Sequence, residues 1–381
     1  MIQTDSSTPK DQEIIFFKVG EFSHVNANVQ EFLSREFPNY SLTVVDVLKD
    51  ILARQPLDWL QAVGQAIALY PKQIFLNARK PTDFLLRTPA AFDAIKRSAG
   101  KWIDQKRTAF TFQTQSLFDS SHPSTPHFVY TDHTSLARLR YRLATDPELL
   151  NSRWIDRERL IYEAARINFS TSQFACYSMI NDYAVDPRRV ACTFSGTNTS
   201  PHIPPTTKDF RSVILFVGID WTRKGGPDLI EAFLRLAPKF PSAELRIVGC
   251  SPPIIHPQIR VFGKRTIEET SKQFQAADIF CMPSYQEPSA VALVEAQLHG
   301  LPVVSTNVGG SGDRLIDGQT GFLVEPGDIT ALTVALDKLL SDPIRAQEMG
   351  KAGVAFAEDR FTWKGVGRTI ADQIRTSLAC P

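Results

Sequence analysis

Two successive series of alternating strand and helix patterns limit most strongly what this chain can fold into. The first series starts at Ile14, and the second starts at Val213. Strands that alternate with helices form β-α-β units, in which helices cover a mostly parallel sheet. The strands expected in the first series are residues 14–20, 40–47, 73–77, 110–115, 127–131, 166–170 and 190–195.

The second series is more regular and follows a turn-rich segment. Residues 196–208 contain three prolines with several Ser, Thr and Asn, which is typical of a linker. The expected strands beyond it are residues 213–218, 244–248, 260–262, 278–282, 302–306 and 321–324. We therefore expect an α/β protein with two doubly wound, Rossmann-like domains, residues 1–205 and 206–362. Ligands of such sheets bind beyond the carboxyl ends of the strands, and two facing sheets make a cleft.

Composition agrees with a two-domain protein and excludes several classes of partner. The 381 residues exceed one ordinary core, and Lys plus Arg (42) balances Asp plus Glu (41), so charge gives no indication of nucleic acid. The five cysteines form no C-x-x-C pair, which favours free thiols in a reducing compartment over structural zinc. The polar N-terminus has no secretory pattern, and no apolar run is long enough to span a membrane. These features predict a cytoplasmic protein.

Two glutamates lie at the expected start of a helix after the strand 278–282. Pro288 and Ser289 favour a helix start, so Glu287 lies at or before it and Glu295 about two turns inside. Both carboxylates can then point toward one bound ligand near the helix N-terminus. The free backbone N–H groups at such an end favour an anion, above all a phosphate. Exposed charges are the plain alternative. Because the residues around Glu295 are mostly apolar, we favour a binding role for its carboxylate.

A basic turn follows the strand that ends at Gly218. Arg223 and Lys224 precede Gly225 and Gly226, and glycine lets backbone approach a ligand closely. A solvated glycine turn is the alternative interpretation. The phosphate-binding interpretation gains weight because this loop and Glu287 follow strands of the same expected sheet, and both should open at its ligand-binding edge.

The second half resembles the retaining glycosyltransferases of family four, which have the GT-B fold. The resemblance covers about residues 212–360. It rests on these matched segments: 278–284, Glu287-Pro288, Glu295-Ala296, 300–304, Gly309-Gly310, 317–324 and 326–328. The first half matches more loosely, through residues 128–134 and 172–174. The GT-B fold implies that the helical segment 363–381 crosses back to the N-terminal domain.

The resemblance implies that the second domain holds a nucleoside-diphosphate sugar. Lys224 matches a lysine on the diphosphate, and Glu287 matches a glutamate near the reacting carbon. Glu295 matches the carboxylate on the ribose hydroxyls. Ser289, Ala290 and Val291 match backbone that receives phosphate and sugar hydroxyls, and Gly263 and Lys264 match backbone beside the base.

Three further positions complete the implied site. His133 resembles a family histidine near the donor sugar, although a hydrogen-bonded structural histidine is the alternative. Gly20 lies in the N-domain loop near acceptor and diphosphate, but the second glycine common in relatives is Glu21 here. Relatives usually have an arginine at the position of Ile219, and we infer that Arg223 supplies that cation.

The function implied is metal-independent retaining transfer of a hexose to a hydroxyl acceptor, either a glycan, a lipid or a small molecule. No Asp-x-Asp motif is present, so no metal and no further cofactor is expected. The alternatives are a GT-B phosphorylase, a nucleotide-sugar epimerase and a non-catalytic nucleotide-sugar-binding protein. A phosphorylase releases sugar phosphate from a glycan, an epimerase converts donor incubated alone, and a binding protein shows no turnover.

A basic and aromatic patch raises the question of peripheral membrane contact. Lys96, Arg97, Lys101, Lys106 and Arg107 surround Trp102 and Ile103. Such a patch can lie on anionic lipid. A solvated basic helix face is the alternative, and it is the interpretation that we favour.

Overall fold

The computed structural model describes residues 12–22, 25–142, 151–197 and 209–379. The expected domain boundary at 205–206, most of the expected linker and the polar N-terminal residues lie outside this part. The chain divides into two compact units. One contains Met1–Arg140, Ala144–Thr193 and Gly367–Pro381, and the other contains Tyr141–Leu143 and Phe194–Val366.

The first unit is built on a six-stranded parallel sheet with the order β2-β1-β3-β4-β5-β6. Its strands are β1 (Glu13–Lys18), β2 (Ser41–Asp46), β3 (Thr108–Thr114), β4 (His127–Thr131), β5 (Ile167–Ser170) and β6 (Val190–Cys192). Its α-helices are α1 (Val25–Glu36), α2 (Pro56–Leu69), α3 (Pro71–Phe75), α4 (Pro89–Ala99), α5 (Ser152–Ala164) and α6 (Gln173–Asn181). Phenylalanines 16, 110, 112, 128 and 169 are buried within the sheet and pack ring against ring.

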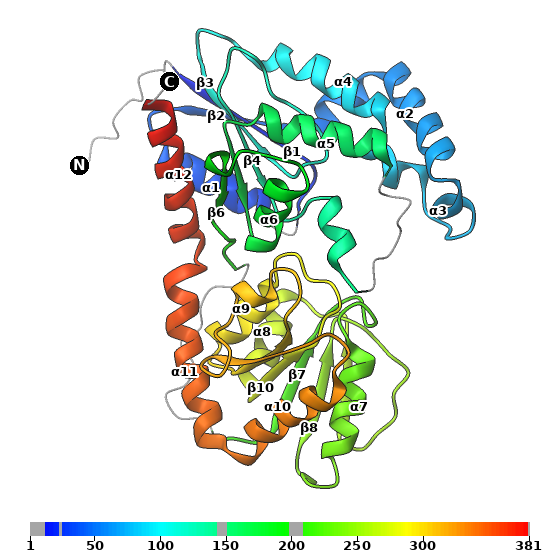
Figure 1. The fold of residues 1–381 in the computed structure, drawn as a ribbon, viewed down its shortest axis with the longest axis vertical. Coiled ribbons are helices and arrows are strands. Elements are labelled where there is room, and N and C mark those ends of the chain that lie inside the picture. The colour runs from blue at the N-terminus through cyan, green and yellow to red at the C-terminus, as the bar shows by residue number, and fades with distance from the viewer. Residues whose placement is uncertain (1–11, 23–24, 143–150, 198–208, 380–381) are drawn as a thin grey trace, which may run out of the picture. The chain divides into compact units, whose positions relative to one another are not determined.

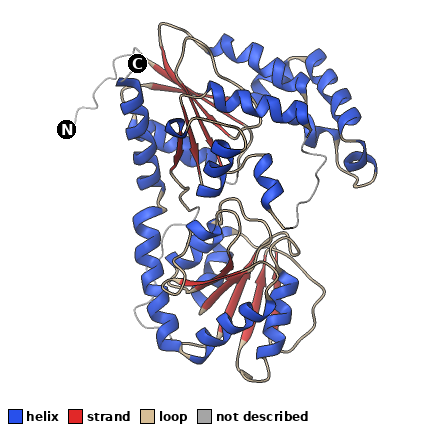
Figure 2. Ribbon diagram, viewed as in Figure 1, coloured by secondary structure: helices blue, strands red, loops and turns tan. Residues whose placement is uncertain are grey.

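The second unit holds another six-stranded parallel sheet, with the order β12-β11-β10-β7-β8-β9. Figures 1 and 2 show helices packed around this sheet. Its strands are β7 (Val213–Val217), β8 (Glu244–Val248), β9 (Ile259–Gly263), β10 (Ile279–Met282), β11 (Val303–Thr306) and β12 (Gly321–Val324). Its helices are α7 (Gly226–Leu236), α8 (Ile267–Ala276), α9 (Val291–Leu298), α10 (Ile329–Ser341) and α11 (Pro343–Arg360). The central strands β7, β10 and β11 are buried on both faces, as expected where helices cover a parallel sheet. Two such sheets confirm the predicted doubly wound α/β fold.

The prediction of a strand at residues 73–77 was wrong. Residues 73–77 were expected to pair in the sheet, but α3 occupies Pro71–Phe75 and its end is exposed, with Phe75 71% accessible. Pro71 starts this helix, and proline fixes the backbone angle that a first helical position needs. The short apolar run Ile74-Phe75-Leu76 resembles a strand in sequence, because periodicity cannot separate such runs from helix ends.

The C-terminal helix α12 (Trp363–Ala379) begins in the second unit, and from Gly367 onward it belongs to the first. Gly367 packs so closely on Phe32 of α1 that an added Cβ would lie 2.6 Å from the Phe32 side chain. Farther along, the Arg375 guanidinium lies 5.0 Å from the ring centre of Phe37. These contacts attach the last turns of α12 to the first unit.

Burial of two histidines in the first unit makes its stability depend on pH. Burial lowers the pKa of His127 from 6.5 to about 4, an effect partly opposed by Asp119. Burial also lowers the pKa of His133 to about 3, and Arg138 and Arg87 add to this effect. Between these values and 6.5 the unfolded chain binds more protons than the folded chain. The stabilisation is therefore complete above pH 6.5 and is lost as the pH falls.

We predict that replacing His127 by Gln flattens the loss of stability on acidification. The neutral imidazole of His127 should contribute up to about 3 kcal/mol of the change in unfolding free energy between pH 6.5 and 4. Urea unfolding of wild type and His127→Gln at pH 7, 6, 5 and 4 measures this difference. His122→Gln, at a half-buried histidine in the loop before β4, is the control. Parallel pH profiles for wild type and His127→Gln would contradict the prediction.

Candidate active site

Glu287 and Lys224 meet at the carboxyl edge of the second sheet. Lys224 follows β7 in the turn before α7, and Glu287 follows β10. The Lys224 ammonium forms an ion pair with the Glu287 carboxylate, and both side chains are largely buried, at 13% and 8% exposed. The structure thus joins two residues that lie 63 positions apart, and it places opposite charges together in a desolvated site where electrostatic interactions are strong.

The backbone around Glu287 is held at both ends of the loop. The Gly310 N–H donates to the Glu287 carbonyl at 2.8 Å, and the Ala290 N–H donates to the Glu287 carboxylate Oε1 at 3.1 Å. At Gly309, with φ +56°, an added Cβ would lie 2.1 Å from the Glu287 carbonyl oxygen. The paired glycines of the sequence motif therefore serve to bring the loop after β11 against the Glu287 backbone.

The helix beyond Glu287 starts later than expected. Ala290 adopts a left-handed conformation with φ +50°, and α9 begins at Val291 rather than at Pro288 or Ser289. Glu295, which is half-buried, consequently lies just over one turn inside α9 instead of two. The N–H groups at the very start of α9 point out of its N-terminus, because helix geometry provides them with no acceptor one turn earlier. The Leu293 N–H already donates to the Ala290 carbonyl, at 3.1 Å.

Arg223 anchors the loop that carries Glu287. Its guanidinium donates to the Gln286 carbonyl at 2.9 Å and lies 3.4 Å from the Asp220 carboxylate, while its own carbonyl accepts from Tyr285 N–H. These contacts fasten the basic turn to the segment after β10. The side chain of the neighbouring Ile219 is 83% exposed.

Gly225 allows the basic turn to pass against the next strand. It has φ +74°, and an added Cβ would lie 1.9 Å from the Pro283 carbonyl oxygen. A side chain at this position would therefore push Lys224 and its turn away from the end of β10.

The predicted base-binding residues lie at the end of β9. Gly263 is the last residue of β9, has φ +68° and accepts from the Gly249 N–H through its carbonyl. Lys264 is exposed in the turn that follows. Both residues follow a strand of the sheet that carries Lys224 and Glu287, so both lie at its carboxyl edge, where the sequence placed the nucleotide.

The two first-unit predictions, His133 and Gly20, follow strand ends of the other sheet. The His133 ring stacks on Phe174 at 6.2 Å, and its carbonyl accepts from Thr131 Oγ1 at 3.1 Å. The lowered pKa keeps this imidazole neutral at pH 7. Gly20, with φ +48°, donates its N–H to the Asp46 carboxylate and accepts from Asn26 Nδ2 at 2.7 Å.

A buried carboxylate that sequence reasoning missed organises the loop after His133. Glu158 of α5 is 2% exposed and accepts from Ser116 Oγ, the Ser135 N–H, Tyr162 and Tyr183. Several donors offset the cost of burying this charge. No local motif marks Glu158, because three of its four partners, Ser116, Ser135 and Tyr183, come from other segments of the chain.

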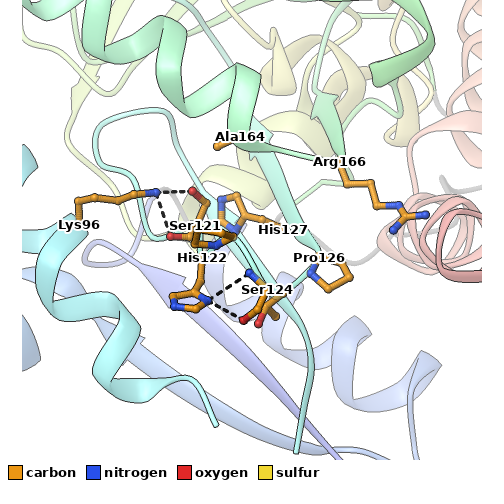
Figure 3. Close-up of a pocket in the computed structure, with 10 residues that line it drawn as sticks. Lys96, Ser121, His122, Ser124, Pro126, His127, Ala164 and Arg166 are labelled. Atoms are coloured by element: carbon orange, nitrogen blue, oxygen red, sulfur yellow. Dashed lines mark hydrogen bonds between the residues drawn. The ribbon is translucent and has the colours of Figure 1, made fainter. Parts of the chain in front are cut away.

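The pocket in Figure 3 lies at the opposite edge of the first sheet from His133 and Gly20. Its volume is about 550 Å³, and its lining includes His127, the first residue of β4, and Arg166, which precedes β5. These residues mark the amino ends of the strands. Lys96 reaches this pocket from α4 and is bound to Ser121 and to the Asp119 carboxylate.

The basic and aromatic patch has less free charge than its composition indicates. Lys96 pairs with Asp119 at 2.8 Å, and Arg97 pairs with Asp58 at 2.9 Å. Trp102 is 36% exposed. Within the described residues, no helix combines the length and apolar character needed to cross a membrane.

Comparison with known proteins identifies a matching family model and several relatives of this chain. Residues 211–342 match the family model described as glycosyl transferases group 1. The D-inositol 3-phosphate glycosyltransferase of Corynebacterium diphtheriae is 30% identical over 273 residues, which cover 64% of this chain and 63% of that protein. A GDP-mannose-dependent alpha-(1-6)-phosphatidylinositol monomannoside mannosyltransferase of Mycolicibacterium smegmatis is 34% identical over 168 residues, covering 39% and 44%. The alignments thus span less than two thirds of each relative's own length.

Solved structures match the whole fold. Sucrose-phosphate synthase from Thermosynechococcus elongatus superposes with a TM-score of 0.68 at 19% identity, over 97% of this chain and 100% of that one. Anabaena HepE in complex with UDP superposes with a TM-score of 0.64 at 14% identity, over 96% and 100%. At these identities the likeness concerns the fold alone, and it confirms the predicted GT-B architecture.

We predict that Gly225→Ala destabilises the protein far more than Gly318→Ala. Both glycines have φ +74°, but an added Cβ at Gly318 meets no atom within 4 Å. Gly318→Ala should therefore lower the free energy of unfolding by about 1 kcal/mol, which is the penalty for a left-handed backbone alone. Gly225→Ala should lower it by at least about 3 kcal/mol. Denaturant unfolding of the two variants measures the difference. Equal decreases in the free energy of unfolding would contradict the prediction, because the close contact with Pro283 would then contribute nothing to the effect of Gly225→Ala.

Proposed function

We propose that this chain, whose residues 211–342 match the family model described as glycosyl transferases group 1, moves a hexose from a nucleoside-diphosphate sugar to a hydroxyl acceptor. The transfer retains the anomeric configuration and needs no metal. The observation that carries the proposal is the buried Lys224–Glu287 pair beside the N-terminus of α9. This arrangement combines a cation, a helix N-terminus and a carboxylate at one sheet edge, which are the groups that a sugar linked to a diphosphate requires.

The chemistry centres on the departing diphosphate. Breaking the bond between the anomeric carbon and the phosphate oxygen leaves negative charge on that oxygen. Lys224 and the N–H groups at the start of α9 stabilise this charge through a fixed cation and fixed dipoles. The acceptor oxygen then bonds to the anomeric carbon on the same face, and its proton passes to the departing phosphate oxygen.

Glu287 acts near the sugar as an orienting and electrostatic residue. In the free protein its carboxylate binds Lys224 and the Ala290 N–H. A bound diphosphate competes for the Lys224 ammonium, and so it releases one carboxylate oxygen of Glu287 for the sugar. Glu287 therefore changes partner in the catalytic cycle, whereas the Ala290 N–H continues to hold the other oxygen.

The donor class follows from these groups and from the relatives. One relative is named as GDP-mannose-dependent, and one solved neighbour is a complex with UDP. The phosphate-binding groups described here do not read the base, because they are a lysine and backbone N–H groups. We therefore propose a nucleoside-diphosphate hexose as the donor class. A thermal-shift screen of UDP-, GDP- and ADP-sugars would identify the base and the sugar, because a ligand that binds the folded state raises its melting temperature.

We predict that Glu287→Gln separates binding from chemistry. Gln keeps an oxygen to accept from Ala290 but loses the charge that acts on the sugar. The rate of transfer should fall at least about 100-fold, roughly 3 kcal/mol in activation free energy. Nucleoside-diphosphate affinity should be unchanged or higher, because Lys224 no longer has a carboxylate partner. Turnover assays and calorimetry measure the two quantities, with Glu325→Gln, an exposed glutamate, as the control. Full turnover by Glu287→Gln would contradict the site assignment.

We also predict that chelation leaves transfer intact. Among the described residues, no group of three or more His, Cys, Asp or Glu side chains is placed to hold a metal ion. The cationic and dipolar groups at Lys224 and α9 supply the charge stabilisation that a divalent ion supplies elsewhere. Rates measured with EDTA and with added Mg²⁺ or Mn²⁺ should agree within about twofold. A strict requirement for Mn²⁺ would contradict the proposed mechanism.

A further inference from the structure

Arg314 is a buried cation next to the proposed donor site. It follows the turn Ser311–Asp313, just beyond the paired glycines, and its exposure is 0%. The rings of Phe361 and Phe194 lie 4.5 and 5.5 Å from its guanidinium carbon. Burying a guanidinium is costly, so its hydrogen bonds must be satisfied in fixed directions.

The guanidinium connects the loop before α9 to the segment after β6. Its Nε donates to the Ser289 carbonyl at 2.8 Å. Its terminal nitrogens donate to the Ser195 carbonyl at 3.3 Å and to the Ser195 hydroxyl at 3.1 Å. The Arg314 carbonyl in turn accepts from Gln297 Nε2 of α9 at 2.6 Å. Arg314 therefore contacts α9 and the loop that precedes it through separate groups.

Arg314 and Glu287 hold the two ends of one peptide group. The Ser289 carbonyl and the Ala290 N–H belong to the same trans peptide, in which they point in opposite directions. Arg314 binds the carbonyl end, and the Glu287 carboxylate binds the N–H end at 3.1 Å. The orientation of this peptide is thus fixed from both sides.

The fixed peptide determines where α9 starts. Ala290 has φ +50°, a conformation that residues other than glycine rarely adopt without support from their surroundings. The turn at Ala290 directs the chain into α9, whose first N–H groups receive the donor phosphate in the proposed mechanism. If the Ser289–Ala290 peptide rotated, these N–H groups and the Glu287 carboxylate would both lose their direction.

We propose that Arg314 is a positioning residue for the donor diphosphate. It holds the Ser289–Ala290 peptide so that the N-terminus of α9 and the Glu287 carboxylate keep the geometry that the diphosphate meets. This role rests on the proposed function, and it adds a residue that lies outside the phosphate, sugar and base contacts. Arg314 acts through the peptide and does not itself touch the donor.

The test compares the affinities of nucleoside diphosphate and nucleoside monophosphate. Arg314→Lys keeps the charge but cannot bridge Ser289 and Ser195 with a planar fork of donors. In the proposed mechanism the diphosphate group contacts the N–H groups at the start of α9, and a monophosphate makes fewer of these contacts. Calorimetry should therefore show that Arg314→Lys binds the diphosphate at least tenfold more weakly than wild type does, and the monophosphate less than twofold more weakly. The pairs to compare are UDP with UMP and GDP with GMP.

Two further variants keep the result interpretable. Arg345→Lys, at an exposed arginine of α11, is the matched control and should change neither affinity. Phe361→Leu removes a ring beside the guanidinium and leaves Ser289 intact, so it should change the affinity ratio in the same direction by a smaller factor. This second variant provides the test if Arg314→Lys does not fold.

The outcomes separate this inference from the proposed function. A selective loss of diphosphate affinity in Arg314→Lys, or in Phe361→Leu, supports the positioning role. Equal losses for both nucleotides, or a lower melting temperature with both affinities intact, would overturn it and leave the proposed function standing. Failure of the wild-type chain to bind either diphosphate would overturn both.

Discussion

The ion pair between Lys224 and Glu287 is the interaction on which the candidate site depends. It joins the ends of β7 and β10 across the carboxyl edge of one sheet. A buried pair of this kind gives little net stability, because desolvation offsets most of the attraction. In the proposed mechanism its role is functional, since it holds two opposite charges at the place where an anionic ligand can separate them.

Glycines and one arginine provide the backbone geometry that this pair needs. Gly225 lets the basic turn approach Pro283, and Gly309 lets the loop after β11 approach Glu287. Arg314 fixes the peptide before α9 from the other side. Close packing of this kind is required because a catalytic group displaced by one ångström loses much of its effect.

The sequence predicted the architecture well, because periodic patterns report burial directly. The strands around Val213 and Ile279 were found where expected. Gly225 was predicted to let backbone approach a ligand, whereas in the structure it lies against the Pro283 carbonyl. The sequence failed where long-range contacts decide the structure. Helix α9 started at Val291, and Glu158 and Arg314 were missed. In addition, residues 73–75 lie in α3, because Pro71 starts a helix there. The sequence gives no signal of burial for Arg314, because only Leu315 and Ile316 separate it from Asp317 and Asp313 precedes it.

A crystal structure with a bound nucleoside diphosphate tests the central claim most directly. The account predicts that the Lys224 ammonium leaves Glu287 and lies about 3 Å from a β-phosphate oxygen, with the first N–H groups of α9 directed at the same phosphate. The Glu287 carboxylate should keep its bond from the Ala290 N–H. A diphosphate bound elsewhere, with the Lys224–Glu287 pair intact, would contradict the account.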